Sequence, residues 1–425
     1  MEDTRPNESR VKLYSAKADA NAILNPLLIW FMLAMVLANI GGNMYGPLLP
    51  LYLKSLQANI AQVGLFFTLS QIIPLGLQIL GGWISDSLGR LRSIAIGSVA
   101  GVLSYVGLIL APTWGWILLG EGLGAITRAL VAPSFGAFIA EQSAEENRAR
   151  VYGITNTIFM VVSVVGPPLG GFLAYHFGFR FMLVCAGIVY TIATVIRVAM
   201  ARYASHNQEK TAQALTLQSL KFNLGMMLTM ILAGGLVTWI LITDGIRDIA
   251  YALSNNLLPI YLQEDGGLNV QQIGLLEAVF GVFMMITTLP AGWLADQKGE
   301  RVGIASGFIL QFAALMIFVQ SHRFWGFALA WSLLGIGVGL MSPAYDSLVS
   351  KAFPAKLRGT AFGLFQTSLG VFSLPAPAIG AQLYQRYGSK FPFRLTAYLA
   401  LLAVIPAWFK FKQIPKENAS VKNDE

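Results

Sequence analysis

The sequence predicts an all-α polytopic membrane protein with twelve transmembrane helices arranged as two six-helix repeats. Composition is the first observation: 55% of the 425 residues are hydrophobic and 12% are charged, and this charged share is about half that of a soluble domain. The second is the recurrence of uncharged apolar runs of about 20 residues, a length that crosses a bilayer as a helix. The third is an internal repeat, in which motifs of the first half return about 210 residues later.

Each expected span is an apolar run bounded by polar or charged residues. The first six are expected near residues 27–53, 60–84, 94–112, 114–140, 151–175 and 179–200. The second six are expected near residues 236–262, 270–294, 302–320, 325–350, 359–385 and 393–411. The resulting units are a tail at 1–25, a bundle at 26–201, a linker at 202–235, a second bundle at 236–412 and a tail at 413–425.

The linker region contains a further apolar stretch that competes as a thirteenth span. A span at 224–243 would invert every later loop and place basic residues such as Lys298 and Lys351 outside. That arrangement contradicts the enrichment of basic residues in cytoplasmic loops. The stretch at 215–233 is therefore interpreted as an interfacial helix that ends before Gly234 and Gly235.

The 29 lysines and arginines predict the orientation of the chain. Most of them, Arg197 included, are assigned to tails and loops on one side of the bundle, which is the cytoplasmic side by the positive-inside rule. Both termini are therefore expected in the cytoplasm, and the protein is expected in the plasma (inner) membrane. The net charge of +8 then reflects topology, so no nucleic-acid partner is expected.

The reactive residue types argue against an enzyme. A single cysteine, Cys185, excludes an intrachain disulfide and a cysteine-built metal site, and the three histidines fall at or beyond expected helix ends. The sequence contains no P-loop and no catalytic cluster. We therefore expect no resident cofactor and no metal.

The internal repeat pairs motifs at a constant offset. Residues 62–64 (Gln-Val-Gly) return at 272–274 (Gln-Ile-Gly). The loop motif returns with four identities: Gly82 with Gly292, Trp83 with Trp293, Asp86 with Asp296, and Gly89 with Gly299. Two parallel six-helix halves are typical of alternating-access carriers. A duplication without transport function is the alternative, but charges within the spans favour a carrier.

These motifs resemble those of a known family. Residues 82–90 (Gly-Trp-Ile-Ser-Asp-Ser-Leu-Gly-Arg) resemble the cytoplasmic loop signature of the major facilitator superfamily, although Ser87 stands where a basic residue is usual. Residues 165–171 (Val-Gly-Pro-Pro-Leu-Gly-Gly) resemble the helix 5 signature of that family's proton-coupled drug antiporters. The arginine usual in early helix 4 of those antiporters is absent, because Glu121 follows Gly120 there and Arg128 comes two turns later.

The resemblance implies a central cavity lined by helices 1, 4, 7 and 10. It also implies that Gly166, Pro167, Gly170 and Gly171 of helix 5 form a hinge. We expect this segment to be close-packed, since glycine permits close helix approach and proline removes a backbone donor. A bulky side chain at Gly170 is expected to block transport while substrate binding is retained.

Charge reversal between the repeats predicts two latches at the cytoplasmic ends of the bundles. Arg90 and its mate Glu300 have opposite signs, and so do Glu141 and its mate Lys351. We infer that Arg90 pairs with Glu141 and Glu300 with Lys351, each pair holding its own half in one packing state. Together with the loop motifs they form the expected cytoplasmic gate. The alternative is four solvated charges, whose pairs would contribute under about 1 kcal/mol each.

Seven ionisable residues fall within the expected spans: Glu121, Arg128, Asp244, Arg247, Asp248, Glu277 and Asp346. Charges at this depth are costly unless they are paired or hydrated. Five acids against two bases leave an excess of negative charge, so some acids are expected to carry protons. Because burial strengthens proton binding by a carboxylate and a nearby arginine weakens it, a moving arginine would couple conformation to protonation.

Helical spacing places the charges of helices 4 and 7. Arg128 and Asp248 are expected near the bilayer middle, where they can face each other across the cavity. Asp244 and Arg247 lie three residues apart on one helix and are expected to pair, and Asp346 is expected nearer the cytoplasm. Ion pairs that only hold helices together are the structural alternative.

The remaining polar positions have competing interpretations. Glu121 and Glu277 lie about seven residues from the outer ends of their spans, and reaching to the interface is the favoured explanation for both. Asn39 and Asn43 stand one turn apart in helix 1. We expect them to line the cavity, although bridging two helices is the commoner role of an amide in a membrane.

The sequence therefore favours a secondary transporter that exports an amphipathic or cationic small molecule in exchange for protons. The proton gradient would supply the energy, the lipid bilayer and the solute would be the partners, and a monomer would suffice. An importer of an anionic metabolite held by Arg128 and Arg247 is the second hypothesis. A membrane sensor on a carrier scaffold is the third.

Overall fold

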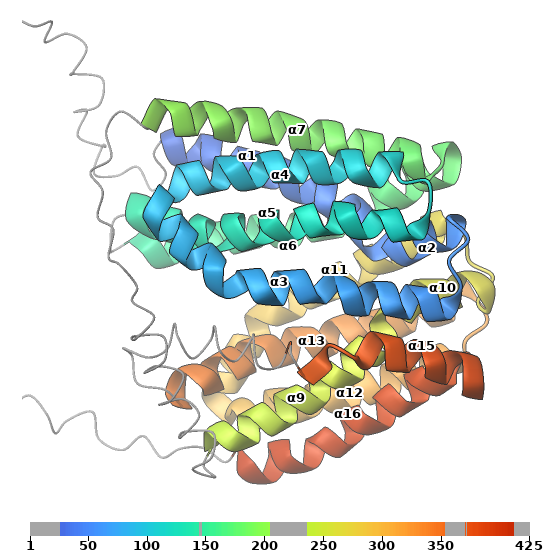
Figure 1. The fold of residues 1–425 in the computed structure, drawn as a ribbon. Coiled ribbons are helices and arrows are strands. Elements are labelled where there is room, and N and C mark those ends of the chain that lie inside the picture. The colour runs from blue at the N-terminus through green and yellow to red at the C-terminus, as the bar shows by residue number, and fades with distance from the viewer. Residues whose placement is uncertain (1–25, 144–146, 205–235, 353–369, 371, 412–425) are drawn as a thin grey trace, which may run out of the picture.

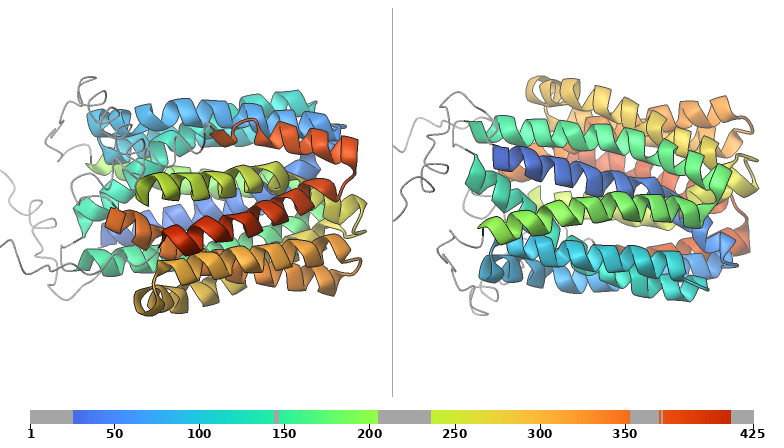
Figure 2. Two further views of the ribbon diagram at one scale, coloured as in Figure 1. Left: turned by 90° about the horizontal axis from the view of Figure 1, so that it is seen from below. Right: turned by 90° about the horizontal axis from the view of Figure 1, so that it is seen from above.

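The computed structural model describes residues 26–143, 147–204, 236–352, 370 and 372–411, and these ranges contain helices and short connections but no strand. The long helices run along one common direction in all three views (Figures 1 and 2). This arrangement agrees with the predicted all-α class. The expected interfacial helix, most of the linker and both tails lie outside the described residues.

The N-terminal half occupies the upper part of Figure 1 and the C-terminal half the lower part. The N-terminal elements are α1 (Pro26–Tyr45), η2 (Gly46–Leu48), α2 (Leu49–Ser55), α3 (Ile60–Leu88), α4 (Arg90–Leu110), α5 (Trp114–Gln142), α6 (Arg148–Phe177) and α7 (Phe179–Ala204). The C-terminal elements are α9 (Leu236–Ser254), η4 (Asn255–Leu257), α10 (Leu258–Glu264), α11 (Val270–Lys298), α12 (Glu300–Gln320), α13 (Phe324–Ala352), α15 (Ala376–Tyr387) and α16 (Phe391–Lys410). Of the eleventh expected span, only the part from residue 370 is described.

Prolines interrupt the first and seventh spans at equivalent places. A 3₁₀ turn at Gly46–Leu48 separates α1 from α2, and another at Asn255–Leu257 separates α9 from α10. Pro50 and Pro259 each follow the start of such a turn by four residues. A proline removes one backbone donor and its ring clashes with the carbonyl four residues earlier. Both spans are therefore segmented near their predicted outer ends.

One-residue glycine connections join several neighbouring helices. Gly89 links α3 to α4 with φ 86°, and its repeat mate Gly299 links α11 to α12 with φ 86°. A residue with a Cβ rarely adopts this backbone conformation. Gly89 and Gly299 of the loop motif therefore make the tight turns between these helices.

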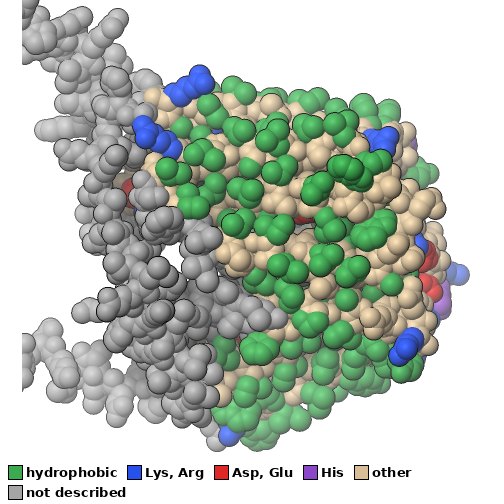
Figure 3. Space-filling model, in the orientation of Figure 1, with side chains coloured by type: hydrophobic (Ala, Val, Ile, Leu, Met, Phe, Trp, Pro, Cys, Tyr) green, Lys and Arg blue, Asp and Glu red, His purple; other side chains and the backbone are tan. Residues whose placement is uncertain are grey.

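The described helices have the length and surface of membrane spans. Ten of them are long and apolar enough to cross a bilayer, and α9 carries three charged residues within its length. Apolar side chains such as Leu103, Val195 and Leu289 are exposed on outward faces. Figure 3 shows hydrophobic side chains over the visible face, with Lys, Arg, Asp and Glu mainly at its two ends. The chain is an integral membrane protein.

Two helix pairs join the halves by close backbone contact near the predicted outer end. On α6, a Cβ added at Gly171 would lie 2.9 Å from the carbonyl oxygen of Val270 on α11. On α3, a Cβ at Gly64 would lie 2.7 Å from the carbonyl oxygen of Pro377 on α15. The repeat offset relates the two contacts, since Gly64 is the mate of Gly274, which packs against Gly171. The halves are thus sealed at this end by two equivalent glycine contacts.

The hinge expected in the fifth predicted span, which is α6, is divided between two interfaces. A Cβ at Gly166 would overlap Asn43, and one at Gly170 would overlap the backbone of Met44, so both glycines face α1 of their own half. Only Gly171 of the three glycines meets the opposite half, while the carbonyl of Pro167 lies against Gly274. Gly170 therefore sits where its half is assembled, not where the two halves meet, and the phenotype expected above for Gly170→Leu is revised.

We predict that Gly171→Leu shifts the protein away from the form closed at the outer end, because the side chain must separate α6 from α11. Gly170→Leu should instead lower the stability of the N-terminal half by roughly 1–3 kcal/mol, the usual cost of overpacking. Gly153→Leu is the control on the same helix, since a Cβ there meets nothing within 4 Å. Labelling of Ser342→Cys in a Cys185→Ser background, from each side of the membrane, measures the shift. Equal accessibility in the Gly171 and Gly153 variants would contradict it.

An ion pair crosses between the halves at the same end. Lys54 Nζ, at the end of α2, lies 2.8 Å from Glu264 Oε1 at the end of α10. The two helices are repeat mates, but the two residues are not, because Lys54 aligns with Gln263 and Glu264 with Ser55. Both side chains are partly exposed, at 28% and 42%, so solvent screens their attraction.

We predict that Lys54→Glu favours opening of the outer end, because it places like charges at the contact. The exchange Lys54→Glu with Glu264→Lys should restore the wild-type distribution. The coupling should be under about 1 kcal/mol, as for other exposed pairs. The same labelling assay gives this energy by a double-mutant cycle, and purely additive effects would show that the pair does not act on the equilibrium.

Candidate functional site

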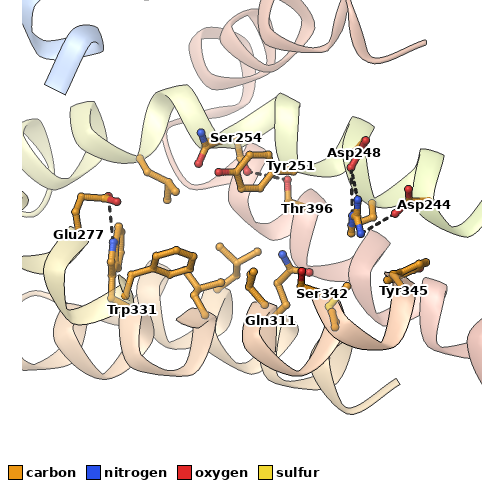
Figure 4. Close-up of a pocket in the computed structure, with 18 of the residues that line it drawn as sticks. Asp244, Asp248, Tyr251, Ser254, Glu277, Gln311, Trp331, Ser342, Tyr345 and Thr396 are labelled. Carbon is orange, nitrogen blue, oxygen red and sulfur yellow. Dashed lines mark hydrogen bonds and ion pairs between the residues drawn. The ribbon is translucent and has the colours of Figure 1, made fainter. Parts of the chain in front are cut away.

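A cavity of about 440 Å³ lies within the C-terminal half (Figure 4). Its lining comes from α9, η4, α10, α11, α12, α13 and α16, and every lining residue falls between positions 244 and 396. The seventh predicted span (α9, η4 and α10) and the tenth (α13) contribute to it as expected. The eighth (α11), the ninth (α12) and the twelfth (α16) contribute as well. The expected cavity residues of the N-terminal half, Arg128, Asn39 and Asn43, do not line it.

Arg247 connects two carboxylates at one end of the cavity. Its Nη1 lies 2.6 Å from Asp244 Oδ1, and its Nη2 lies 2.9 Å from Asp248 Oδ1. The guanidinium also lies over the ring of Tyr345, with 5.0 Å from Cζ to the ring centroid. The pairing of Asp244 with Arg247 is the one predicted from their spacing. Because Asp248 lies on the same helix, a single cation serves both acids.

The two aspartates differ in exposure. The Asp244 side chain is 6% exposed, whereas that of Asp248 is 34% exposed. Both bonds that Arg247 donates to Asp248 end on Oδ1. Oδ2 of Asp248 accepts no bond within the described part of the chain, which leaves it available to a proton from the cavity.

The cavity has more acids than its base can neutralise. Four carboxylates line it, those of Asp244, Asp248, Glu277 and Asp346, against the guanidinium of Arg247. Asp346 is exposed toward the cavity and forms no ion pair among the described residues. Such an excess of negative charge in a membrane attracts protons or a cationic occupant.

Glu277 lies at the opposite end of the cavity from the aspartates (Figure 4). It accepts a hydrogen bond of 3.3 Å from the indole Nε1 of Trp331 and is partly buried. The favoured explanation for Glu277 was a reach to the outer interface, and the structure contradicts it. The reason is tertiary: α13 places Trp331 beside the carboxylate and turns it toward the cavity.

The charged residues of the fourth predicted span, which is α5, form a separate group in the N-terminal half. Glu121 Oε2 lies 3.2 Å from Arg128 Nη2, and Tyr45 donates a 3.3 Å hydrogen bond to Glu121 Oε1. The Glu121 side chain is 8% exposed, so its expected reach to the interface is wrong as well. Arg128 therefore pairs with Glu121 on its own helix, and the structure does not bring it to Asp248.

The two amides of helix 1 are satisfied within their own helix. Asn39 Nδ2 donates to the carbonyl oxygen of Met35 at 2.8 Å, and Asn43 Nδ2 donates to that of Asn39 at 2.9 Å. The Asn43 Cβ also packs against Gly166 of α6. In this structure both amides serve helix 1 and its packing.

The expected cytoplasmic gate is brought together in part. Arg90 Nε donates to Glu141 Oε1 at 3.0 Å, and Lys351 donates to Glu300 Oε1, which also accepts from Ser347. Each pair stays within its own half, as inferred from the sign reversal. A Cβ at Gly292 would meet nothing within 4 Å. The environment of Gly82 and the side chains of Asp86 and Asp296 lie outside the description.

Sequence reasoning misplaced one charged residue. Arg197, assigned to a cytoplasmic segment, lies within α7 with 2% exposure. It donates to Ser98 Oγ at 2.8 Å and lies over Tyr190. No carboxylate pairs with it in the described ranges. Arg197 lies inside the span expected at 179–200, so its assignment to a cytoplasmic segment conflicted with that span.

Several neutral polar residues of the cavity were also missed. The clearest are Tyr251, Gln311, Trp331, Tyr345 and Thr396. Gln311 carried a usable signal, since it is an amide in the middle of the apolar span at 302–320. The aromatic residues carried none, because aromatic side chains are frequent throughout membrane helices. Within the described residues no group of His, Cys, Asp and Glu could hold a metal ion.

Comparison with known proteins identifies the family. The family model of the Major Facilitator Superfamily matches residues 31–243 and 240–425. The chain belongs to this superfamily of transporters.

Individual relatives are more distant. The chain is 24% identical to a "Multi-drug resistance efflux pump PmrA homolog" of Lactococcus lactis subsp. lactis, over 86% of this chain and 90% of the relative. It is 23% identical to the "Quinolone resistance protein NorA" of Staphylococcus aureus, over 84% and 89% of the two chains. A crystal structure of a peptide transporter POT in complex with sulfate superposes with a TM-score of 0.72 at 13% identity, covering 90% of this chain and 93% of that one. The structural likeness establishes the fold.

We predict that Arg90→Glu impairs transport, because it replaces attraction by repulsion between the first residue of α4 and Glu141 near the C-terminal end of α5. Combining it with Glu141→Arg should recover part of the loss, since the second repeat already carries the swapped order. Initial transport rates of the two single variants and the double variant give the coupling energy. A double variant no better than the sum of the singles would show that the pair does not act as a latch.

Proposed function

We propose that this transporter exports amphipathic or cationic small molecules in exchange for protons, by alternating access of its two halves. The observation that carries the proposal is the cavity lined by four carboxylates and one guanidinium. The names of the relatives, a multidrug efflux pump and a quinolone resistance protein, support export of drug-like compounds.

Proton coupling follows from the electrostatics of this cavity. If all four carboxylates were ionised, their charge would exceed that of Arg247 by three. Protons bound at Asp248 or Asp346 reduce this excess, and so does a cationic solute. Because both lower the same unfavourable field, binding of one disfavours binding of the other. Mutual exclusion of proton and solute is the basis of exchange.

Import of an anion is less well supported. It requires an arginine whose charge is available to the solute. Arg247 already serves Asp244 and Asp248, and Arg128 serves Glu121. Each guanidinium is thus already paired with carboxylates of its own helix, which offset the positive charge that an anion would need. For the membrane sensor, no described feature gives specific support.

The proposal includes the setting of the protein. Both termini would lie in the cytoplasm of the plasma membrane, as the distribution of basic residues suggests. The two halves of one chain would complete the transport path, so a monomer would be the working unit. The proton gradient would drive the cycle without a bound cofactor.

The direct test uses the purified protein in liposomes with an imposed pH gradient. Ethidium, a fluorescent aromatic cation, should be accumulated only when protons can flow in the opposite direction. Addition of ethidium should in turn release protons across the membrane. Accumulation that is unaffected by collapse of the pH gradient would reject proton exchange.

We predict that Asp248→Asn abolishes accumulation driven by the pH gradient while ethidium counterflow continues. The amide cannot bind and release a proton, yet it resembles a protonated carboxyl group in shape. Asp248→Glu is the matched control, since it keeps a titratable group and should retain coupling. Proton flux per transported ethidium is the measurement. An unchanged ratio in Asp248→Asn would remove Asp248 from the coupling step.

A further inference from the structure

The cavity has two chemically different ends (Figure 4). At one end Arg247 holds Asp244 and Asp248 in ion pairs. At the other end Glu277 has no ion pair within the described residues, and Trp331 Nε1 is its hydrogen-bond donor. A carboxylate is therefore presented to the cavity without a protein cation to neutralise it.

The surroundings of Glu277 are aromatic. Trp331 is 2% exposed and packs against Phe318 with ring centroids 5.4 Å apart, so its position is held from behind. Phe280 lies one turn after Glu277 on α11 and lines the cavity. Tyr251 stands between Glu277 and Asp248 in Figure 4 and is 53% exposed. Aromatic faces attract cations and offer flat apolar surface to a ring system.

Glu277 is also next to the seal between the halves. It follows Gly274 by three residues and precedes Gly281 by four, which places the three on neighbouring positions of one helix face. Gly274 packs against Pro167, and Gly281 against Val164, both on α6 of the opposite half. A ligand bound at Glu277 would therefore touch the helix on which outer closure depends.

We propose that Glu277, oriented by Trp331 and flanked by Tyr251 and Phe280, binds the positive charge of the transported organic cation. The aspartate cluster around Arg247 would handle the proton at the other end of the same cavity. This assignment rests on the proposed function and adds a division of roles within it. It makes Glu277 the residue that selects cationic over neutral aromatic solutes.

The geometry favours this division over a single shared site. The aspartates already have a guanidinium as counter-ion, so an organic cation there would compete with Arg247. At Glu277 the cation meets an uncompensated charge, and the indole N–H holds the carboxylate in place. Binding at one end still lowers the field felt at the other, so exchange with protons is preserved.

The test compares two probes of similar size, the cation tetraphenylphosphonium and the neutral triphenylphosphine oxide. Their affinities are measured by equilibrium binding to the purified protein, with Glu277→Gln as the main variant. We expect tetraphenylphosphonium binding to weaken by about tenfold or more, the effect of removing the Coulombic attraction of one nearby carboxylate. Binding of triphenylphosphine oxide should change by less than about twofold.

Asp346→Asn is the matched charge control, because it removes one negative charge from the same cavity at a distance from Glu277. It should weaken tetraphenylphosphonium binding much less than Glu277→Gln does. Equal losses in the two variants would mean that the whole cavity field attracts the cation, and the assignment of Glu277 would fail. Unchanged affinity in Glu277→Gln would overturn it as well.

Trp331→Phe provides an independent variant if Glu277→Gln does not fold. It keeps an aromatic ring but removes the donor that orients Glu277, so it should weaken binding of the cation and not of the neutral probe. Equal affinity of wild type and this variant for the cation would count against the orienting role and the proposed subsite.

The outcomes separate this inference from the proposed function. Wild-type protein that binds neither probe rejects export of amphipathic cations altogether. Cation binding that depends on Glu277 without proton-driven transport supports the subsite and rejects the exchange mechanism. Proton-driven transport with a cation affinity that does not depend on Glu277 supports the exchange mechanism and rejects the subsite.

Discussion

Arg247 is the interaction on which the charged part of this protein depends. Without its guanidinium, Asp244 and Asp248 would present two carboxylates in a membrane helix at a cost of several kcal/mol. With it, Asp244 can stay at 6% exposure while Asp248 remains open to the cavity. The pairing fixes the two acids on one face of α9, and within the described residues it leaves Glu277 and Asp346 without a counter-ion. The proposed exchange of protons for cations rests on that imbalance.

The internal repeat is also visible in the contacts between the two halves at the predicted outer end. Equivalent glycines, Gly64 and Gly274, bring α3 against α15 and α11 against α6 at the same end of the molecule. The ion pair of Lys54 with Glu264 joins α2 to α10 at that end. The repeat does not duplicate this pair, because Lys54 aligns with Gln263 and Glu264 with Ser55. Closure is therefore pseudo-symmetric in packing and asymmetric in charge.

The two halves have diverged most in their polar interiors. In the N-terminal half, Arg128 pairs with Glu121, and Arg197 is buried beside Ser98. The C-terminal half instead contains the cavity with its excess of acids. This division suggests that the C-terminal half carries ligand and proton chemistry, while the N-terminal half provides the surface against which α11 closes. Glu277 lies where these two tasks meet.

The sequence by itself determined the class of the protein. Apolar run length, basic residues and the repeat offset established a twin six-helix membrane bundle, since they depend on the bilayer and on local periodicity. Spacing along one helix also predicted the pairing of Asp244 with Arg247, and the sign reversal between repeats predicted Arg90 with Glu141 and Glu300 with Lys351. The first of these pairs lies within one helix, and the other two stand at equivalent positions of the repeat.

Tertiary structure alone decided which charges share a cavity. Glu277 looked like an interface residue because its depth can be counted along a helix, whereas its neighbour Trp331 comes from α13, more than fifty positions away. Arg128 was matched with Asp248 by depth, but its guanidinium pairs with Glu121, two turns earlier on the same helix. Gly170 and Gly171 are adjacent in sequence and yet face different halves, because successive helical residues point about 100° apart. Partners across helices depend on rotation and packing, which a single sequence does not specify.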